Sequence, residues 1–201
     1  MPSDSLQWKK KALIPNFVAA YRYGGDRSYI RLAGILSPIS YEMRDNVTAP
    51  YTTKTIWGGG VNLTGAVYLT QLSSLKLQAS YGSGISTNNV ALNGEGYDAI
   101  PNLYRGNQLR ALPFFSTSGA YEHWWNSRWS SVIFYGYARV GGGSIPDGMI
   151  KKLQNAGINI VYQPFSKFRI GIEGHYGMLQ KYGIQKYANA FRCQLSTALS
   201  F

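Results

Sequence analysis

Basic side chains are the residues of this sequence whose positions suggest chemistry, and that chemistry is the electrostatic attraction of anions. The chain carries 20 Lys and Arg residues against 9 Asp and Glu residues, a formal net charge of +11 at pH 7. Such a balance favours an anionic partner, which could be nucleic acid, lipid headgroups or small solutes. The basic residues are spread along the chain and form no patch, which argues against nucleic-acid binding.

Residues that could catalyse a reaction or hold a metal ion are few. His123 and His175 are the two histidines, and neither has an obvious carboxylate to orient it for general-base work. Cys193 is the single cysteine, which excludes an intrachain disulfide and a multi-cysteine metal site. The glycine runs at 58–60 and 141–143 lack the Gly-Lys-Ser/Thr of a phosphate loop. We therefore predict no enzyme, no cofactor and no metal.

The elements that position these residues are predicted to be strands, because apolar and polar residues alternate with a period of two. The 16 Tyr and 5 Trp residues support this all-β reading, since strands favour aromatic side chains. No apolar run approaches the roughly 18 residues of a membrane-spanning helix. We predict strands near residues 15–23, 28–42, 55–70, 74–84, 109–125, 129–140, 153–163, 167–179 and 190–201.

The connections between these strands alternate strictly between short and long. Tight turns are predicted at 24–27, 71–73, 126–128 and 164–166, and longer polar loops at 45–54, 84–108, 141–152 and 180–187. Outer-membrane barrels have short periplasmic turns and longer external loops. A soluble sandwich has no reason to sort its loops by length. The pattern predicts an antiparallel transmembrane β-barrel segment of about nine strands.

The last predicted strand has one face suited to lipid and one suited to a wet lumen. Its apolar set is Phe191, Cys193, Leu195, Thr197, Leu199 and Phe201, which alternates with Arg192, Gln194, Ser196, Ala198 and Ser200. Successive side chains of a strand point to opposite faces, so the two sets separate. The strand also stops on an aromatic residue, as outer-membrane barrels typically do.

The same alternation assigns the basic residues to the lumen. The candidate solute path consists of Arg22, Arg31, Arg139, Arg169 and Arg192, and Lys76 also faces inward; Glu122 and Glu173 are the main luminal acids. Fixed positive charge lowers the barrier for anions and raises it for cations. Arg105 and Arg110 flank the longest loop and could fold inward to constrict the pore.

Aromatic residues gather near strand ends, where the membrane meets water. The predicted interface set is Trp57, Trp125, Trp129, Tyr176 and Phe201. Amphipathic rings prefer this level of a bilayer, and outer-membrane barrels carry aromatic girdles there. Ordinary core packing would not concentrate aromatic residues beside turns.

Several segments resemble DcaP-type trimeric porins, in the right order along the chain. They are residues 15–26 with Tyr21-Arg22-Tyr23 and a Gly-Asp turn, 31–36, 121–129, 161–164, 171–177 and 190–196. The resemblance implies an outer-membrane barrel of about sixteen strands, a trimer, and passage of small organic anions such as dicarboxylates. Of that family's basic pore residues, Arg22 and Arg192 match best.

The sequence departs from a full member of that family in length. A full member would carry a signal peptide, a periplasmic segment and further strands before residue 14. The basic residues Lys9–Lys11 and the short apolar stretch 12–20, broken by Pro15, are a poor match to a signal peptide. We expect a basic N-terminal segment at 1–13, porin strands at 14–201, and a truncated remnant rather than a barrel completed in an unusual way.

The overall prediction is the C-terminal part of a porin in the outer membrane of a Gram-negative bacterium. The expected partners are outer-membrane lipid, small anionic solutes, two further copies in a homotrimer, and the barrel-assembly machinery through the last strand. The alternatives are a small closed barrel that acts as an adhesin or surface-binding protein, a non-functional porin fragment, and a soluble β-protein.

Overall fold

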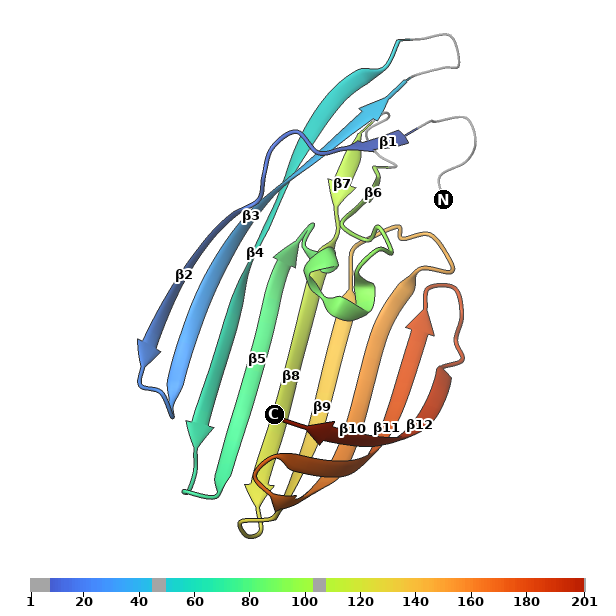
Figure 1. Cartoon of the computed structure of the whole chain (residues 1–201). Coiled ribbons are helices and arrows are strands. Elements are labelled where there is room, and N and C mark those ends of the chain that lie inside the picture. Colours follow the sequence, from blue (N-terminus) through green and yellow to red (C-terminus); the bar gives the residue numbers. More distant parts are fainter. Residues whose placement is uncertain (1–7, 45–49, 103–107, 201) are drawn as a thin grey trace.

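A computed structural model describes residues 8–44, 50–102 and 108–200 as one large curved antiparallel sheet with a small two-stranded sheet beside it (Figure 1). The large sheet has the order β1-β3-β4-β5-β8-β9-β10-β11-β12, and β2 also pairs with β3. As described, this sheet does not close on itself. Its strands are β1 (Trp8–Lys11), β2 (Phe17–Gly24), β3 (Tyr29–Met43), β4 (Thr52–Tyr68), β5 (Ser73–Ser83), β8 (Pro113–Trp124), β9 (Trp129–Val140), β10 (Ile150–Phe165), β11 (Phe168–Lys181) and β12 (Ala188–Leu199).

The nine strands predicted from the sequence are confirmed, and each pairs with its neighbour along the chain. The structure adds β1, which the sequence analysis left in a basic N-terminal segment. This short strand pairs with the far end of β3, where Lys11 stands opposite Ser40. Lys11 also forms an ion pair with Glu42. Across the residues that the structure describes, no helix is long and apolar enough to span a membrane.

The alternation of short and long connections is also confirmed. Short turns join β2 to β3, β4 to β5, β8 to β9 and β10 to β11 at one end of the sheet, which we call the short-turn end. Long connections join the remaining neighbours at the opposite end, the long-loop end (Figure 1). Antiparallel pairing puts successive connections at opposite ends of the sheet. The alternation of short and long connections along the chain therefore becomes a sorting by end.

The longest connection spans residues 84–112, and its described parts, 84–102 and 108–112, lie over one side of the sheet (Figure 1). We call it the inward segment. It holds two 3-10 turns, η1 (Ser86–Asn88) and η2 (Val90–Leu92), and the hairpin of β6 (Ala99–Pro101) and β7 (Leu109–Ala111). The sequence pattern predicts a polar loop at 84–108 and a strand from 109, whereas residues 109–111 belong to this hairpin and β8 begins at Pro113. The structure gives the inward segment a core, because Ile85, Leu92, Ile100 and Leu112 pack against strand residues.

The side of the sheet that the inward segment covers is called the loop face, and the other side the outer face. Phe114, Ala138 and Val140 lie on the loop face, since they belong to the cluster around the inward segment. Strand register carries this assignment across the sheet, because residues directly opposite each other share a face.

The outer face exposes large apolar side chains over its whole width. Leu63, Leu77, Ile133, Ile158 and Leu195 are each at least 45% exposed. Apolar area on this scale marks a surface that contacts something other than water.

Two opposed glycines on neighbouring strands allow the inward segment to pack directly against the sheet. Gly60 on β4 stands opposite Gly82 on β5, on the loop face. A Cβ at Gly60 would lie 2.5 Å from Cδ1 of Ile85, and one at Gly82 would lie 2.8 Å from it. The Ile85 side chain therefore occupies space that any other residue at these positions would fill.

Candidate functional site

The first pair of basic residues of the predicted solute path lies on the loop face. Arg22 on β2 stands directly opposite Arg31 on β3. Like charges in that position repel, and the Arg22 side chain turns toward the short-turn end. Its Nη2 donates to the Gly25 carbonyl at 2.9 Å, and its guanidinium lies 4.4 Å from the ring centre of Tyr29. Arg31 forms no salt bridge with any carboxylate of the described residues.

The second pair, Arg169 and Arg192, also lies on the loop face, near the other edge of the sheet. Arg169 stands opposite Ala198, and Arg192 stands opposite His175. Arg192 donates to Oε1 of Gln194 at 2.7 Å. The two arginines, Gln194 and the nearby Glu173 carboxylate make this edge of the loop face polar.

From the sequence, neither histidine has an obvious carboxylate partner, and for His175 this prediction is wrong. Nε2 of His175 is hydrogen-bonded to Oε1 of Glu173, and Asn159 donates to the other carboxylate oxygen at 3.2 Å. The two residues are two apart on one strand, so they share a face; sequence spacing could have shown this pairing. His123 instead lies on the outer face, where its Nδ1 is 2.8 Å from Oγ of Ser73.

Lys76 and Glu122 neutralise each other on the loop face. Nζ of Lys76 lies 2.9 Å from Oε2 of Glu122, and the Ser74 hydroxyl donates to the same oxygen at 3.3 Å. The Lys76 side chain is 56% exposed and that of Glu122 is 27% exposed. The pair contributes no net charge to this face.

Arg139 is a correction to the predicted solute path. It stands opposite Phe115, one residue along from the opposed pair Phe114 and Val140. Since Phe114 and Val140 pack beneath the inward segment, Arg139 must lie on the outer face. The sequence could not decide this, because β9 has apolar residues on both faces.

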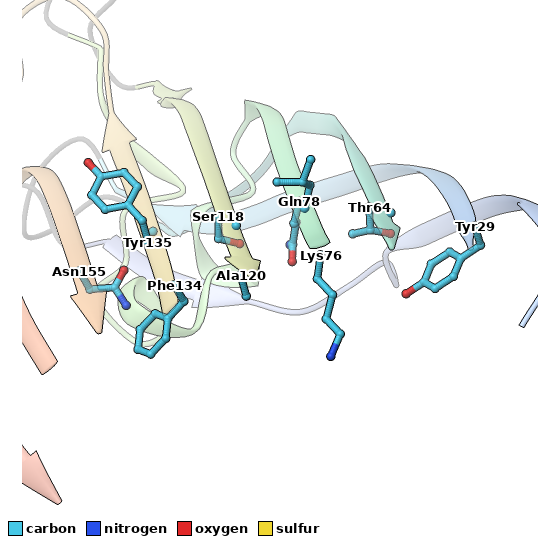
Figure 2. A pocket seen from close by; sticks show the side chains of 13 residues that line it. Tyr29, Thr64, Lys76, Gln78, Ser118, Ala120, Phe134, Tyr135 and Asn155 are labelled. Carbon is cyan, nitrogen blue, oxygen red and sulfur yellow. The ribbon is translucent and has the colours of Figure 1, made fainter. Parts of the chain in front are cut away.

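Two shallow hollows lie on the loop face among these charges. The larger, of about 390 Å³, is lined by Thr64, Lys76, Gln78, Ser118, Phe134 and Asn155 among others. Figure 2 shows most of these side chains hanging from neighbouring strands to one side of the sheet, whereas Tyr135 points to the other side. The smaller hollow, of about 290 Å³, lies against the inward segment; its polar lining includes Arg31, Asn62, Gln78, Ser80, Asn88 and Ser116.

One carboxylate, that of Asp98, joins separate parts of the inward segment to each other. Asp98 accepts hydrogen bonds from the Ser86 hydroxyl at 2.9 Å and from the Thr87 hydroxyl at 2.7 Å. It also accepts from the Thr87 backbone N–H at 3.0 Å. The Asp98 carbonyl receives the N–H of Leu112 at 2.9 Å, which joins the two halves of the segment.

Neighbouring long connections add further ties at this end. Arg110 donates to the carbonyls of Gly143 and Ser144 in the next long connection, so it does not reach into the hollows. Arg105 lies outside the described residues. Burial raises the pKa of the Tyr182 phenol, and its hydroxyl donates to the Val140 carbonyl at 2.9 Å.

The aromatic residues assigned to the membrane interface lie on or beside the outer face, so far as they are described. Trp57 is 53% exposed and Trp125 is 63% exposed. Trp129 stacks on Tyr162 with ring centres 4.5 Å apart. Tyr176 lies on the outer face opposite Phe191. Phe201 lies outside the described residues, and the interface role of the other four remains a prediction.

Polar and titratable groups of the described residues do not form a metal site, since no group of three or more His, Cys, Asp or Glu is placed to hold an ion. What the loop face offers is fixed charge and hydrogen-bonding groups along an open wall. The class that this fold defines is an all-β antiparallel segment of porin-barrel type.

Comparison with solved structures supports that class. The chain is similar in structure to the outer membrane channel DcaP of Acinetobacter baumannii, with a TM-score of 0.75 and 18% sequence identity. The match covers 100% of this chain and 55% of that channel, so the chain spans about half the length of the channel. The resemblance to DcaP-type porins seen in the sequence is thereby confirmed for the fold. No family model matches the chain. No curated protein matches it either.

Proposed function

We propose that this chain forms part of the wall of an outer-membrane porin through which small, preferably anionic solutes diffuse. The observation that carries the proposal is the placement of Arg22, Arg31, Arg169 and Arg192 on the face that the inward segment covers. Fixed positive charge along a water-filled path favours anions. Organic mono- and dicarboxylates are the solutes that these arginines fit best, since a guanidinium binds a carboxylate bidentately.

The remaining expectations belong to the same proposal. A barrel of about sixteen strands, assembled as a homotrimer in the outer membrane of a Gram-negative bacterium, would place the outer face against lipid. The alternating pattern of β12 supports recognition of this strand by the barrel-assembly machinery. Diffusion through such a pore requires no catalysis and no cofactor.

The proposal is tested by measuring the ion selectivity of the protein in a bilayer. Purified, refolded protein is inserted into planar bilayers, and the reversal potential is measured in a KCl gradient. We expect a voltage whose sign shows that chloride is more permeant than potassium, and expect dicarboxylates to reduce the chloride current. A preference for potassium would overturn the basic-lumen argument. Absence of conductance would favour a surface-binding barrel or a non-conducting fragment.

A further inference from the structure

The outer face of β9 and β10 changes in character from one end of the strands to the other. Starting at the short-turn end, β9 presents Trp129, Ser131, Ile133, Tyr135, Tyr137 and Arg139. The neighbouring strand presents Tyr162, Ile160, Ile158, Ala156, Gln154 and Lys152. The order is an aromatic pair, an aliphatic stretch, tyrosines, and then two adjacent basic side chains. Residues on the loop face of the same strands show no such order.

The spacing of these residues matches the thickness of a membrane. A strand rises about 3.3 Å per residue, so Arg139 lies roughly 33 Å along β9 from Trp129. At the tilt of about 40° usual in outer-membrane barrels, this is a height of about 25 Å, which equals the apolar band of such proteins. With the Trp129–Tyr162 stack at one interface, Arg139 and Lys152 reach the headgroup level of the other.

Arg139 and Lys152 are directly opposed on neighbouring strands, and no carboxylate of the described residues forms a salt bridge with either. Phe115 stands beside Arg139 in the same row, and Gln180 stands beside Lys152. Two adjacent cations without a counter-ion repel each other unless an anion lies between them. Long basic side chains at this depth extend along the apolar surface and keep their charged ends at the interface.

We propose that Arg139 and Lys152 bind the phosphate of an anionic lipid headgroup in the leaflet at the long-loop end, with Phe115 and Tyr137 contacting its acyl chains. Phosphate supplies the acceptor oxygens that a guanidinium and an ammonium group both require. The ring of Phe115 lies in the row of Arg139 and that of Tyr137 in the next row, 6.1 Å apart, and together they offer the apolar surface. The inference rests on the proposed membrane location of the outer face, not on conduction.

The experiment measures lipid binding to the full chain refolded in neutral detergent micelles. The probe is bisphosphorylated lipid A, and its binding is followed by native mass spectrometry. The test variant is Arg139→Gln/Lys152→Gln. The matched control is Arg169→Gln/Arg192→Gln, which removes the same charge from the loop face. A basic side chain near an anionic surface contributes about a fivefold gain in affinity, so the test variant should bind on the order of 25-fold more weakly.

Each outcome of this experiment either supports or overturns the proposed lipid site. Weak binding by the test variant alone, with micromolar inorganic phosphate failing to compete, supports the site. Equal binding by wild type and test variant overturns it, as does an equal loss in the control. Competition by free phosphate at such concentrations overturns it too, because the site would then take a soluble anion. Lipid binding that depends on the two residues, in a protein without conductance, would count against the pore and support this site. Conductance, together with equal lipid affinity of wild type and test variant, would support the pore and count against this site.

Discussion

The two ends of the loop face differ in the kind of side chain they carry and in how far it is buried. At the long-loop end, the inward segment and the strands enclose apolar side chains, and Leu112 is 0% exposed. At the short-turn end, Arg22, Arg31 and the Lys76–Glu122 pair remain open to water. The difference shows how one wall can serve two purposes. Burial of apolar area holds the inward segment in one position, and the unburied charge stays accessible to solutes, as the proposed pore requires.

The largest expected effect comes from opening the apolar end. Leu112→Ala should destabilise the packed inward segment by about 2–5 kcal/mol, the usual cost of truncating a fully buried leucine. We expect faster proteolysis within residues 84–112 and a larger or noisier single-channel conductance. The control is Leu77→Ala, a substitution on the outer face where the side chain is 54% exposed. Equal proteolysis of both variants would show that the segment is not held by this core.

A smaller effect is expected from Asp98→Asn, which tests the polar tie of the same segment. The amide keeps one acceptor oxygen and cannot accept from the Ser86 and Thr87 groups on both sides, so loosening by about 1–3 kcal/mol should follow. The measurement is again the rate of proteolysis within the inward segment. Glu95→Gln removes a nearby charge that lacks these contacts. If Glu95→Gln loosened the segment as much, charge rather than hydrogen bonding would be responsible.

At the basic end, Arg31→Gln should reduce anion preference, whereas the double variant Lys76→Gln/Glu122→Gln should leave it nearly unchanged, because that pair carries no net charge. Arg31 has no carboxylate partner in the described structure, whereas Lys76 is paired with Glu122. One charge about 8 Å from an ion in water contributes about 0.5 kcal/mol, or roughly twofold in the chloride-to-potassium permeability ratio. Glu122→Gln should raise that ratio. Reversal potentials are measured for each variant, and a loss of anion preference in the double variant as large as that of Arg31→Gln would contradict a neutral Lys76–Glu122 pair.

The smallest effect on conduction is expected from Arg139→Gln. This residue has the charge of a pore residue but lies on the outer face, so its removal should leave the reversal potential unchanged within error. A loss of anion preference as large as that of Arg31→Gln would indicate that Arg139 faces the lumen and would contradict the register of β8 and β9. The comparison with Arg31 thus separates charge in the pore from charge on the protein as a whole.

Much of the fold follows from local patterns. The strict alternation of apolar and polar residues in β12 assigns Phe191, Arg192 and their neighbours to opposite faces of the sheet without reference to any tertiary contact. The same holds for Arg22, Arg31 and Arg169, whose strands have one clearly apolar face. The turn residues between these strands also located the short-turn end. Local sequence suffices there because side-chain direction in a strand depends only on position along the strand.

The sequence by itself therefore determined an antiparallel β segment, nine of the described strands of its large sheet and the alternation of its short and long connections. Only the tertiary structure decided the face of β9, where Ile133 and Phe134 are both apolar and period two gives no direction. Burial of Val140 beneath the inward segment decides it and sends Arg139 outward. Packing of Ile85 over Gly60 and Gly82 was equally hidden, because it joins strands to a loop whose apolar residues follow no period. Long-range burial, and not local pattern, settles such positions, since only a folded partner removes an apolar side chain from water.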